Sequence, residues 1–96
     1  PRAERFAVHK MIVAVERREQ AKSAKDLQQA GTLIEALAIK RPLELASSWL
    51  TAWNTGRRWR EKLDAGRERL PEPMRDALDQ VLERATARRK GRYRSV

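Results

Sequence analysis

The sequence predicts an all-α fold, a small bundle of about five helices, and three observations support this prediction. The chain is rich in Ala, Leu, Glu, Arg and Gln, which favour helix, and has only four glycines in 96 residues. Apolar residues recur at the three- and four-residue spacing of a helix face. Proline or glycine separates most of these periodic stretches. Hydrophobic residues make up 41% of the chain, which is enough for the core of one domain.

The first helix is predicted over residues 3–18. One of its faces is apolar and carries Val8, Met11, Ile12 and Val15. Phe6 and Val13 point to the opposite side, beside Lys10 and Arg17. A helix that is apolar on two sides is usually buried on two sides. The pattern therefore hints at a partner that a five-helix chain does not itself provide.

The second helix is predicted over residues 21–40, with an apolar stripe of Leu27, Ala30, Ile34 and Leu37. Ser23 and Asp26 have the spacing of a capping box, which places the break between the first two helices near Gln20. The alternative is one long rod, because neither glycine nor proline lies between them. Gly31 inside the second helix weakens this prediction slightly.

Three shorter segments complete the predicted bundle. Pro42 ends the second helix and begins the third, which runs to the Asn54-Thr55-Gly56 stop. The fourth helix is predicted from residue 57 to residue 65, with Gly66 as its end. The fifth covers residues 72–89 and has the cleanest apolar stripe of the chain: Met74, Ala77, Leu78, Val81, Leu82 and Ala85. Residues 1–90 are thus one helical domain, and residues 91–96 are a basic tail that we expect to fray.

Positive charge is concentrated at the end of the chain. The net charge is +9, but residues 84–96 hold six basic residues and no acidic one, so the rest carries only +3. These cations could neutralise nucleic-acid phosphates, and Tyr93 could stack on a base. The nucleic-acid candidates are Arg88, Arg89, Lys90, Arg92, Tyr93 and Arg94. The alternative is a solubilising helix end, where cations are also favourable.

A second basic and aromatic patch that could bind nucleic acid is formed in the sequence by Trp59 and its neighbours Arg57, Arg58, Arg60 and Lys62. The simpler interpretation is that Trp59 packs inward with Leu63, one helical turn away. Trp49 and Trp53 are expected to pack in the core or against another lobe, and the alternative is an aromatic cage for a ligand.

The sequence lacks the elements of a complete catalytic or metal site. It has no cysteine, one histidine (His9), no distinguished carboxylate pair and no glycine-rich phosphate loop. No apolar run approaches the roughly 20 residues of a membrane span. We therefore expect a cytoplasmic protein with no membrane partner and no catalytic residue, metal or cofactor site of its own.

Two stretches of the chain carry a resemblance to a known family. Arg5 is followed by Phe-Ala-Val-His-Lys-Met-Ile-Val-Ala, and residues 22–30 read Lys-Ser-Ala-Lys-Asp-Leu-Gln-Gln-Ala, before Leu33-Ile34. These segments resemble the patterns R-[YF]-A-x-H-K-L-[IL]-V and K-x-x-K-D-L-x-Q-A of bacterial nucleotidyltransferase-fold proteins in the DNA polymerase β superfamily. Met11 stands where the pattern has Leu. The resemblance is strong over residues 3–37 and weaker beyond.

The resemblance implies that this chain is the C-terminal helical lobe of a longer protein. That family's catalytic lobe carries a Gly-Ser turn and paired metal-binding carboxylates, and this sequence has neither a Gly-Ser nor an Asp-x-Asp. The lobe would pack on its own catalytic lobe and help to hold a nucleotide. It would be inactive alone, whereas the full-length protein would use a nucleoside triphosphate and a divalent metal such as Mg²⁺ to transfer a nucleotidyl group.

By the same resemblance, Lys10, Lys22, Lys25 and His9 would face the cleft between the lobes, where a lysine could hold a triphosphate. Asp26 would either hold a lysine or cap the second helix. The alternative is that these residues form salt bridges at the lobe interface. Two other functions stay open: a basic module that binds nucleic acid through its tail, and an adaptor that binds a protein through the Phe6 and Val13 face.

Overall fold

The computed structural model describes residues 2–94, with side chains as far as residue 87. Within that part the chain forms five α-helices and no strand, which confirms the all-α prediction. In chain order the helices are α1 (Ala3–Glu16), α2 (Gln20–Lys40), α3 (Pro42–Trp53), α4 (Arg57–Arg69) and α5 (Glu72–Arg94). None of these five helices is both long enough and apolar enough to cross a membrane.

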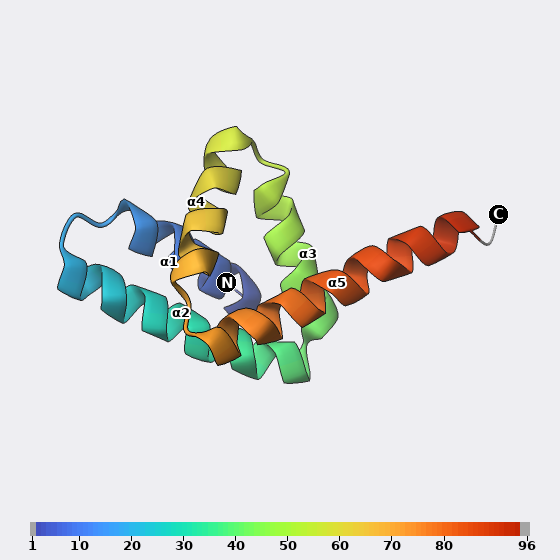
Figure 1. Ribbon diagram of the computed structural model, residues 1–96, viewed down its shortest axis with the longest axis horizontal. Coiled ribbons are helices and arrows are strands. Elements are labelled where there is room, and N and C mark those ends of the chain that lie inside the picture. Colours follow the sequence, from blue (N-terminus) through green and yellow to red (C-terminus); the bar gives the residue numbers. More distant parts are fainter. Residues whose placement is uncertain (1, 95–96) are drawn as a thin grey trace.

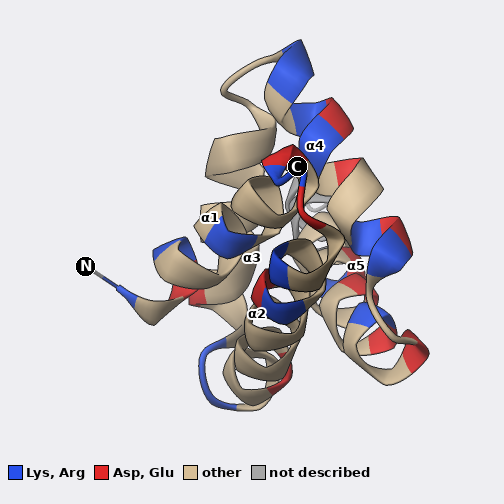
Figure 2. Ribbon diagram, turned by 90° about the vertical axis from the view of Figure 1, so that its left-hand side faces the viewer, with Lys and Arg blue, Asp and Glu red and all other residues tan. Residues whose placement is uncertain are grey.

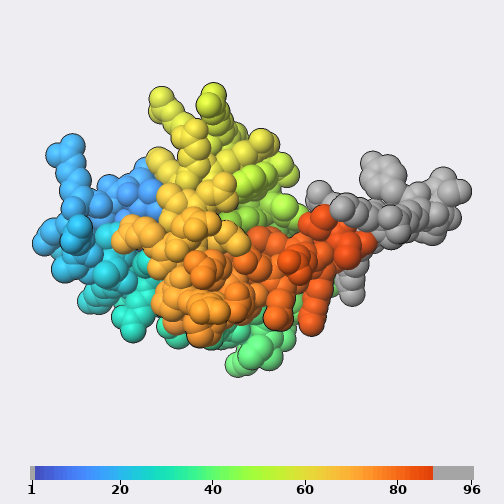
Figure 3. Space-filling model, in the orientation of Figure 1, coloured from blue at the N-terminus to red at the C-terminus, as the bar shows by residue number. Residues whose placement is uncertain are grey.

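Helices α1 and α2 form an antiparallel hairpin, to which the other three helices attach (Figure 1). α3 turns away from the end of α2, and α4 returns across α1. α5 starts against α2, passes α3 and then runs away from the body of the molecule. Figure 3 shows α4 and the first turns of α5 in front of the hairpin. The side of α1 that carries Phe6 and His9 faces solvent.

One apolar core joins all five helices. Its largest fully buried side chains come one from each helix in turn: Met11, Ile34, Leu45, Leu63 and Leu78. Trp49 is also buried, and Trp53 packs half-buried against this cluster, as the sequence predicts. Because each helix contributes its apolar stripe to the same cluster, no helix of the bundle can be removed without exposing the others.

The break between α1 and α2 lies where the sequence places it, but the capping-box explanation is wrong. α2 begins at Gln20, and its N-cap residue, Glu19, makes no side-chain capping bond. Ser23 lies inside the helix, and its hydroxyl donates a hydrogen bond to the Ala14 carbonyl of α1 at 2.5 Å. The serine thus links two helices rather than starting one.

Three other helix ends differ from the prediction, and the first is that of α1, which ends at Glu16 rather than at residue 18. α4 continues through Gly66 to Arg69, and this glycine lies at the contact with α1 rather than at a helix end. A Cβ at Gly66 would lie 3.1 Å from Met11 Cε, which is tighter than ordinary van der Waals contact. α5 extends to Arg94 rather than ending at Arg89. The side chains from residue 88 onward lie outside the described residues, so the fraying of residues 91–96 stays a prediction.

Candidate functional site: the two flanks of helix α1

The solvent-facing side of α1 has two flanks. Phe6 and Lys10, one helical turn apart, lie on the flank next to α2. Arg5 and His9, also one turn apart, lie on the flank next to α3. The Arg-Phe-Ala-Val-His-Lys segment therefore presents Arg5 and His9 on one surface of the molecule, and Phe6 and Lys10 on another.

On the α2 flank, Asp26 gathers two cations from α1. Its carboxylate is only 5% exposed and accepts hydrogen bonds from Arg17 Nε at 2.7 Å and from Lys10 Nζ at 3.0 Å. The bond from Arg17, followed by that from Lys10, holds the pKa of Asp26 below its usual value. Because Asp26 lies inside α2, it holds a lysine and does not cap the helix. Because two cations face one carboxylate, a net positive charge remains at this contact between α1 and α2.

Two further polar contacts fix the orientation of the hairpin. Ser23 Oγ, which donates to α1, also accepts a hydrogen bond from Arg69 Nη2 of α4 at 2.9 Å. Glu4 is buried and accepts a hydrogen bond from Arg41 Nε at 3.3 Å, where α2 meets α3. The start and the end of α1 are thereby tied to its neighbours, which sets how its outer side is presented.

Phe6 is not part of the core, as its position opposite the apolar face of α1 predicts. Its side chain is 53% exposed, and the Lys10 ammonium lies 5.5 Å from the ring centroid. A shallow apolar depression beside it on α2 is lined by Phe6, Gln28, Gln29, Thr32, Leu33 and Ala36. Val13 is half-buried. The α2 flank therefore presents an aromatic ring and an anchored cation on one surface.

The structure does not gather all the site residues that the sequence predicts. Lys10 and Asp26 meet, but His9 lies on the other flank of α1. Lys22 is near the link between α1 and α2, where its ammonium pairs with Glu19 at 3.3 Å, and Lys25 is exposed. The predicted nucleotide or interface role of these residues stays a prediction. The nucleic-acid candidates of the tail (Arg88, Arg89, Lys90, Arg92, Tyr93 and Arg94) have side chains outside the described residues.

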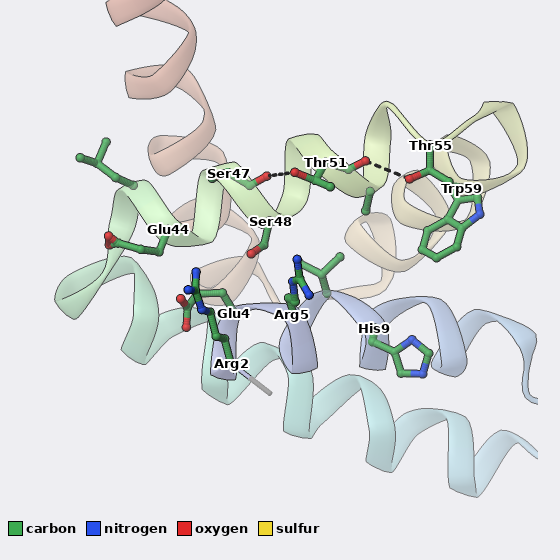
Figure 4. A pocket seen from close by; sticks show the side chains of 13 residues that line it. Arg2, Glu4, Arg5, His9, Glu44, Ser47, Ser48, Thr51, Thr55 and Trp59 are labelled. Carbon is green, nitrogen blue, oxygen red and sulfur yellow. Dashed lines mark hydrogen bonds between the residues drawn. The ribbon is translucent and has the colours of Figure 1, made fainter.

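The α3 flank of α1 borders an open groove with a volume of about 690 Å³ (Figure 4). Arg5 and His9 form its α1 wall, and Trp59 of α4 closes one end. The α3 wall carries the hydroxyl side chains of Ser47, Ser48 and Thr51, and Thr55 continues this face just after the end of α3. Sequence reasoning missed this wall, although the four-residue spacing of Ser47, Thr51 and Thr55 marks one helix face.

Trp59 does not pack inward with Leu63, so that prediction is wrong. Trp59 is 39% exposed and lines the groove, whereas Leu63 is fully buried. α4 makes its close approach to α1 at Gly66, beyond Leu63. The first turn of α4 therefore overhangs the groove, and the indole has no core to enter.

A family model described as nucleotidyltransferase matches residues 1–54 of the 96, which is more than half of the chain. The chain belongs to this nucleotidyltransferase family. The matched segment includes α1, α2 and α3, so it contains Asp26 with its two cations and the groove walls apart from Thr55, but not Trp59. No curated protein and no solved structure matches the chain.

The acidic and histidine side chains of the described residues do not gather into one cluster. In that part of the chain no three His, Cys, Asp or Glu side chains come together where they could hold a metal ion. The most buried carboxylates, Glu4 and Asp26, are each engaged by cations. One flank of α1 presents an aromatic ring beside anchored cations, and the other borders the groove.

Proposed function

We propose that this chain is the C-terminal helical lobe of a bacterial nucleotidyltransferase. It packs through the α2 flank of α1 onto a catalytic lobe that carries the paired carboxylates. That lobe binds Mg²⁺ and a nucleoside triphosphate, and this chain supplies helices that complete the nucleotide cleft. The chain has no catalytic residue of its own in this proposal. The family match supports the enzyme class, and the exposed flank supports the role of this part.

The observation that carries the proposal is the exposure of Phe6 within the segment matched by the family model. Burying an aromatic side chain of this size against a partner is strongly favourable. Phe6 lies on a helix whose opposite face is already in the core, and the apolar depression on α2 adjoins it. A docked lobe would cover this flank without disturbing the bundle.

The anchored cations support the nucleotide part of the proposal. Asp26 holds Lys10 and Arg17 in fixed positions at the edge of the Phe6 surface. Cations that are positioned before a ligand arrives lose less conformational entropy when they bind a phosphate. Lys10 is the residue we assign to the nucleotide phosphates, and Asp26 is the residue that positions it.

The docking part is tested by expressing this chain together with the catalytic lobe encoded in the same reading frame, as two separate polypeptides. We expect Phe6→Asp to weaken their association at least tenfold in a pull-down or by calorimetry. Ile39→Asp is the matched control, because Ile39 is 84% exposed at the far end of α2 and should not affect association. Equal association of both variants with the lobe overturns the proposal, as does a reading frame without a Gly-Ser and Asp-x-Asp lobe.

The nucleotide part has its own measurement, made on the associated lobes. Lys10→Gln is expected to lower the affinity for a nucleoside triphosphate severalfold, because it removes a positive charge from the cleft. Lys40→Gln, at the exposed end of α2, serves as the control that removes the same charge elsewhere. If both variants bind the triphosphate as wild type does, Lys10 is an interface residue and not a nucleotide ligand.

A further inference from the structure

The groove between α1 and α3 has no part in the proposed docking, yet its walls are chemically distinct. Its volume of about 690 Å³ is in the range of small-molecule and nucleotide sites. One long wall is the Arg5 and His9 side of α1, and the other is the hydroxyl face of α3 (Figure 4). Trp59 lies at one end, and Glu44 lies at the other. The two ends therefore favour different ligand groups.

The cationic part of the groove is available to an anion. Among the described residues, Arg5 forms no ion pair with a carboxylate. Glu4 also lines the groove, but it is buried and its charge is offset by Arg41. Glu44 stands away from the Trp59 end (Figure 4). An anionic group in the middle of the groove would therefore meet the Arg5 guanidinium without a competing carboxylate.

The α3 wall offers hydrogen-bond acceptors. Thr51 Oγ1 donates its proton to the Ser47 carbonyl at 2.8 Å, and Thr55 Oγ1 donates to the Thr51 carbonyl at 2.9 Å. Each hydroxyl has one proton, so these two threonines present only lone pairs to the groove. They suit a ligand that carries N–H or O–H donors, such as the amino and imino groups of a base or the hydroxyl of a ribose.

The Trp59 end adds an aromatic face and further positive charge. The indole is 39% exposed, which leaves a surface on which a planar base can stack. Arg57 and Arg58 are exposed in the first turn of α4. Arg57 pairs with Glu61 at 3.3 Å, whereas Arg58 forms no ion pair among the described residues. Basic residues colour this end of α4 blue in Figure 2. Arg60 is held over the Trp53 ring by a hydrogen bond to the Trp53 carbonyl. Positive charge thus continues outside the groove, past its aromatic end.

We propose that this groove binds single-stranded nucleic acid. One base stacks on Trp59 with its donors facing the threonine wall, and a neighbouring phosphate lies at Arg5. The strand continues over the first turn of α4, where Arg58 adds a positive charge outside the residues that line the groove. A strand is favoured over a duplex because only unpaired bases expose a face to the indole and donors to the wall.

The test measures binding of a short fluorescent single-stranded oligonucleotide to the 96-residue chain by anisotropy. We expect Trp59→Ala and Arg5→Ala each to lower the affinity at least about fivefold. Trp59→Phe should retain most of the affinity, because a phenyl ring still stacks. Arg84→Ala, an exposed arginine of α5, is the matched control and should change binding little. Circular dichroism confirms that each variant is folded.

Three other arms separate the groove from competing sources of binding. A duplex of the same sequence and a free mononucleotide should both bind more weakly than the single strand. Arg5→Ala should reduce the salt dependence of binding by about one phosphate contact. A chain ending at Ala87 should still bind the strand. The proposal is overturned if truncation abolishes binding while Trp59→Ala does not, or if the mononucleotide binds as tightly as the strand.

This inference does not depend on the nucleotidyltransferase proposal. Its test uses the chain alone, whereas the docking test needs the catalytic lobe. Loss of strand binding in Trp59→Ala with unchanged lobe association would support the two proposals separately, because Trp59 and Phe6 belong to different surfaces.

Discussion

The α1–α2 hairpin and the three helices that follow it bury different kinds of side chain. The buried polar residues of the described chain, Glu4, Ser23 and Asp26, all lie in the hairpin. The buried residues of α3, α4 and α5 are apolar or glycine, and the Arg67–Asp79 ion pair between α4 and α5 is partly exposed. Polar contacts demand a specific geometry, whereas an apolar core demands mainly volume. The hairpin is thus the part of the fold whose orientation is most strictly specified.

Both surfaces that we propose to be functional involve this hairpin. α1 borders both the Phe6 flank and the groove, and its two ends are tied to neighbouring helices by Glu4 and Ser23. A shift of α1 would move both surfaces at once. We interpret the buried polar residues as the means by which α1 is held in register, whereas the apolar burial is shared between the hairpin and the other three helices.

The largest effect is expected from truncating the apolar core. Leu63 of α4 is fully buried, so Leu63→Ala should lower the free energy of unfolding by about 3 kcal/mol, through lost burial and the cavity left behind. Leu43→Ala is the matched control: Leu43 is 52% exposed, and its truncation should cost no more than about 0.5 kcal/mol. Urea denaturation of both variants measures the difference. Similar losses at the two sites would mean that α4 is not packed into the core as described.

A smaller loss is expected when the charge of Asp26 is removed. Asp26→Asn leaves Lys10 and Arg17 without their carboxylate, but both cations reach solvent and can be rehydrated. Asp79→Asn is the matched control in the other half of the molecule, where the ion pair is already partly exposed. We expect the melting temperature to fall more for Asp26→Asn than for Asp79→Asn. The reverse order would contradict the contrast between the two halves.

The stabilisation by Asp26 should also depend on pH. Its pKa is lowered in the folded protein, so its contribution is complete above the unfolded value of 3.8 and is lost as pH falls through the lower folded value. The difference in melting temperature between wild type and Asp26→Asn should therefore be constant near neutral pH and shrink below about pH 4. A difference that persists unchanged at lower pH would show that the charge of Asp26 is not the cause.

The smallest effect is expected at Ser23. Ser23→Ala removes the hydrogen bond to Ala14 and the acceptor for Arg69, which should cost about 1 kcal/mol, because Arg69 can turn to water. Ser47→Ala, on the exposed face of α3, should be nearly neutral. Urea denaturation resolves the two, and a neutral Ser23→Ala would mean that this hydroxyl does not hold α1 and α2 together.

Local patterns predicted the helices well because each one carries an apolar stripe or a strong end signal. Pro42 and the Asn54-Thr55-Gly56 turn marked the limits of α3 correctly. The predictions of local roles were wrong at residues that contact a segment far away in the sequence. Gly66 resembles a helix end but serves the approach of α4 to α1, and Ser23 resembles a cap but bonds to Ala14. In both cases a tertiary contact replaced the local role of the residue.

The candidate site was predictable only in part. Helix periodicity places Phe6 and Val8 on opposite sides of α1. It therefore predicted that Phe6 would lie outside the core if Val8 lay inside it. The resemblance left open whether Asp26 holds a lysine, and the structure shows it holding Lys10 and Arg17. Nothing in the sequence indicated that Trp59 faces the hydroxyls of α3, because that depends on where α4 crosses α1.

The sequence by itself determined an all-α chain, the approximate limits of its helices, its basic end and its membership of a nucleotidyltransferase family. These follow from periodicity, composition and motif, which are properties of neighbouring residues. Only the tertiary structure decided that the Arg5-to-Lys10 segment serves two surfaces and that Asp26 joins two cations across the hairpin. It also decided that Trp59 overhangs a groove. Those features depend on the crossing of helices, which is set by long-range packing and buried polar contacts rather than by any local pattern.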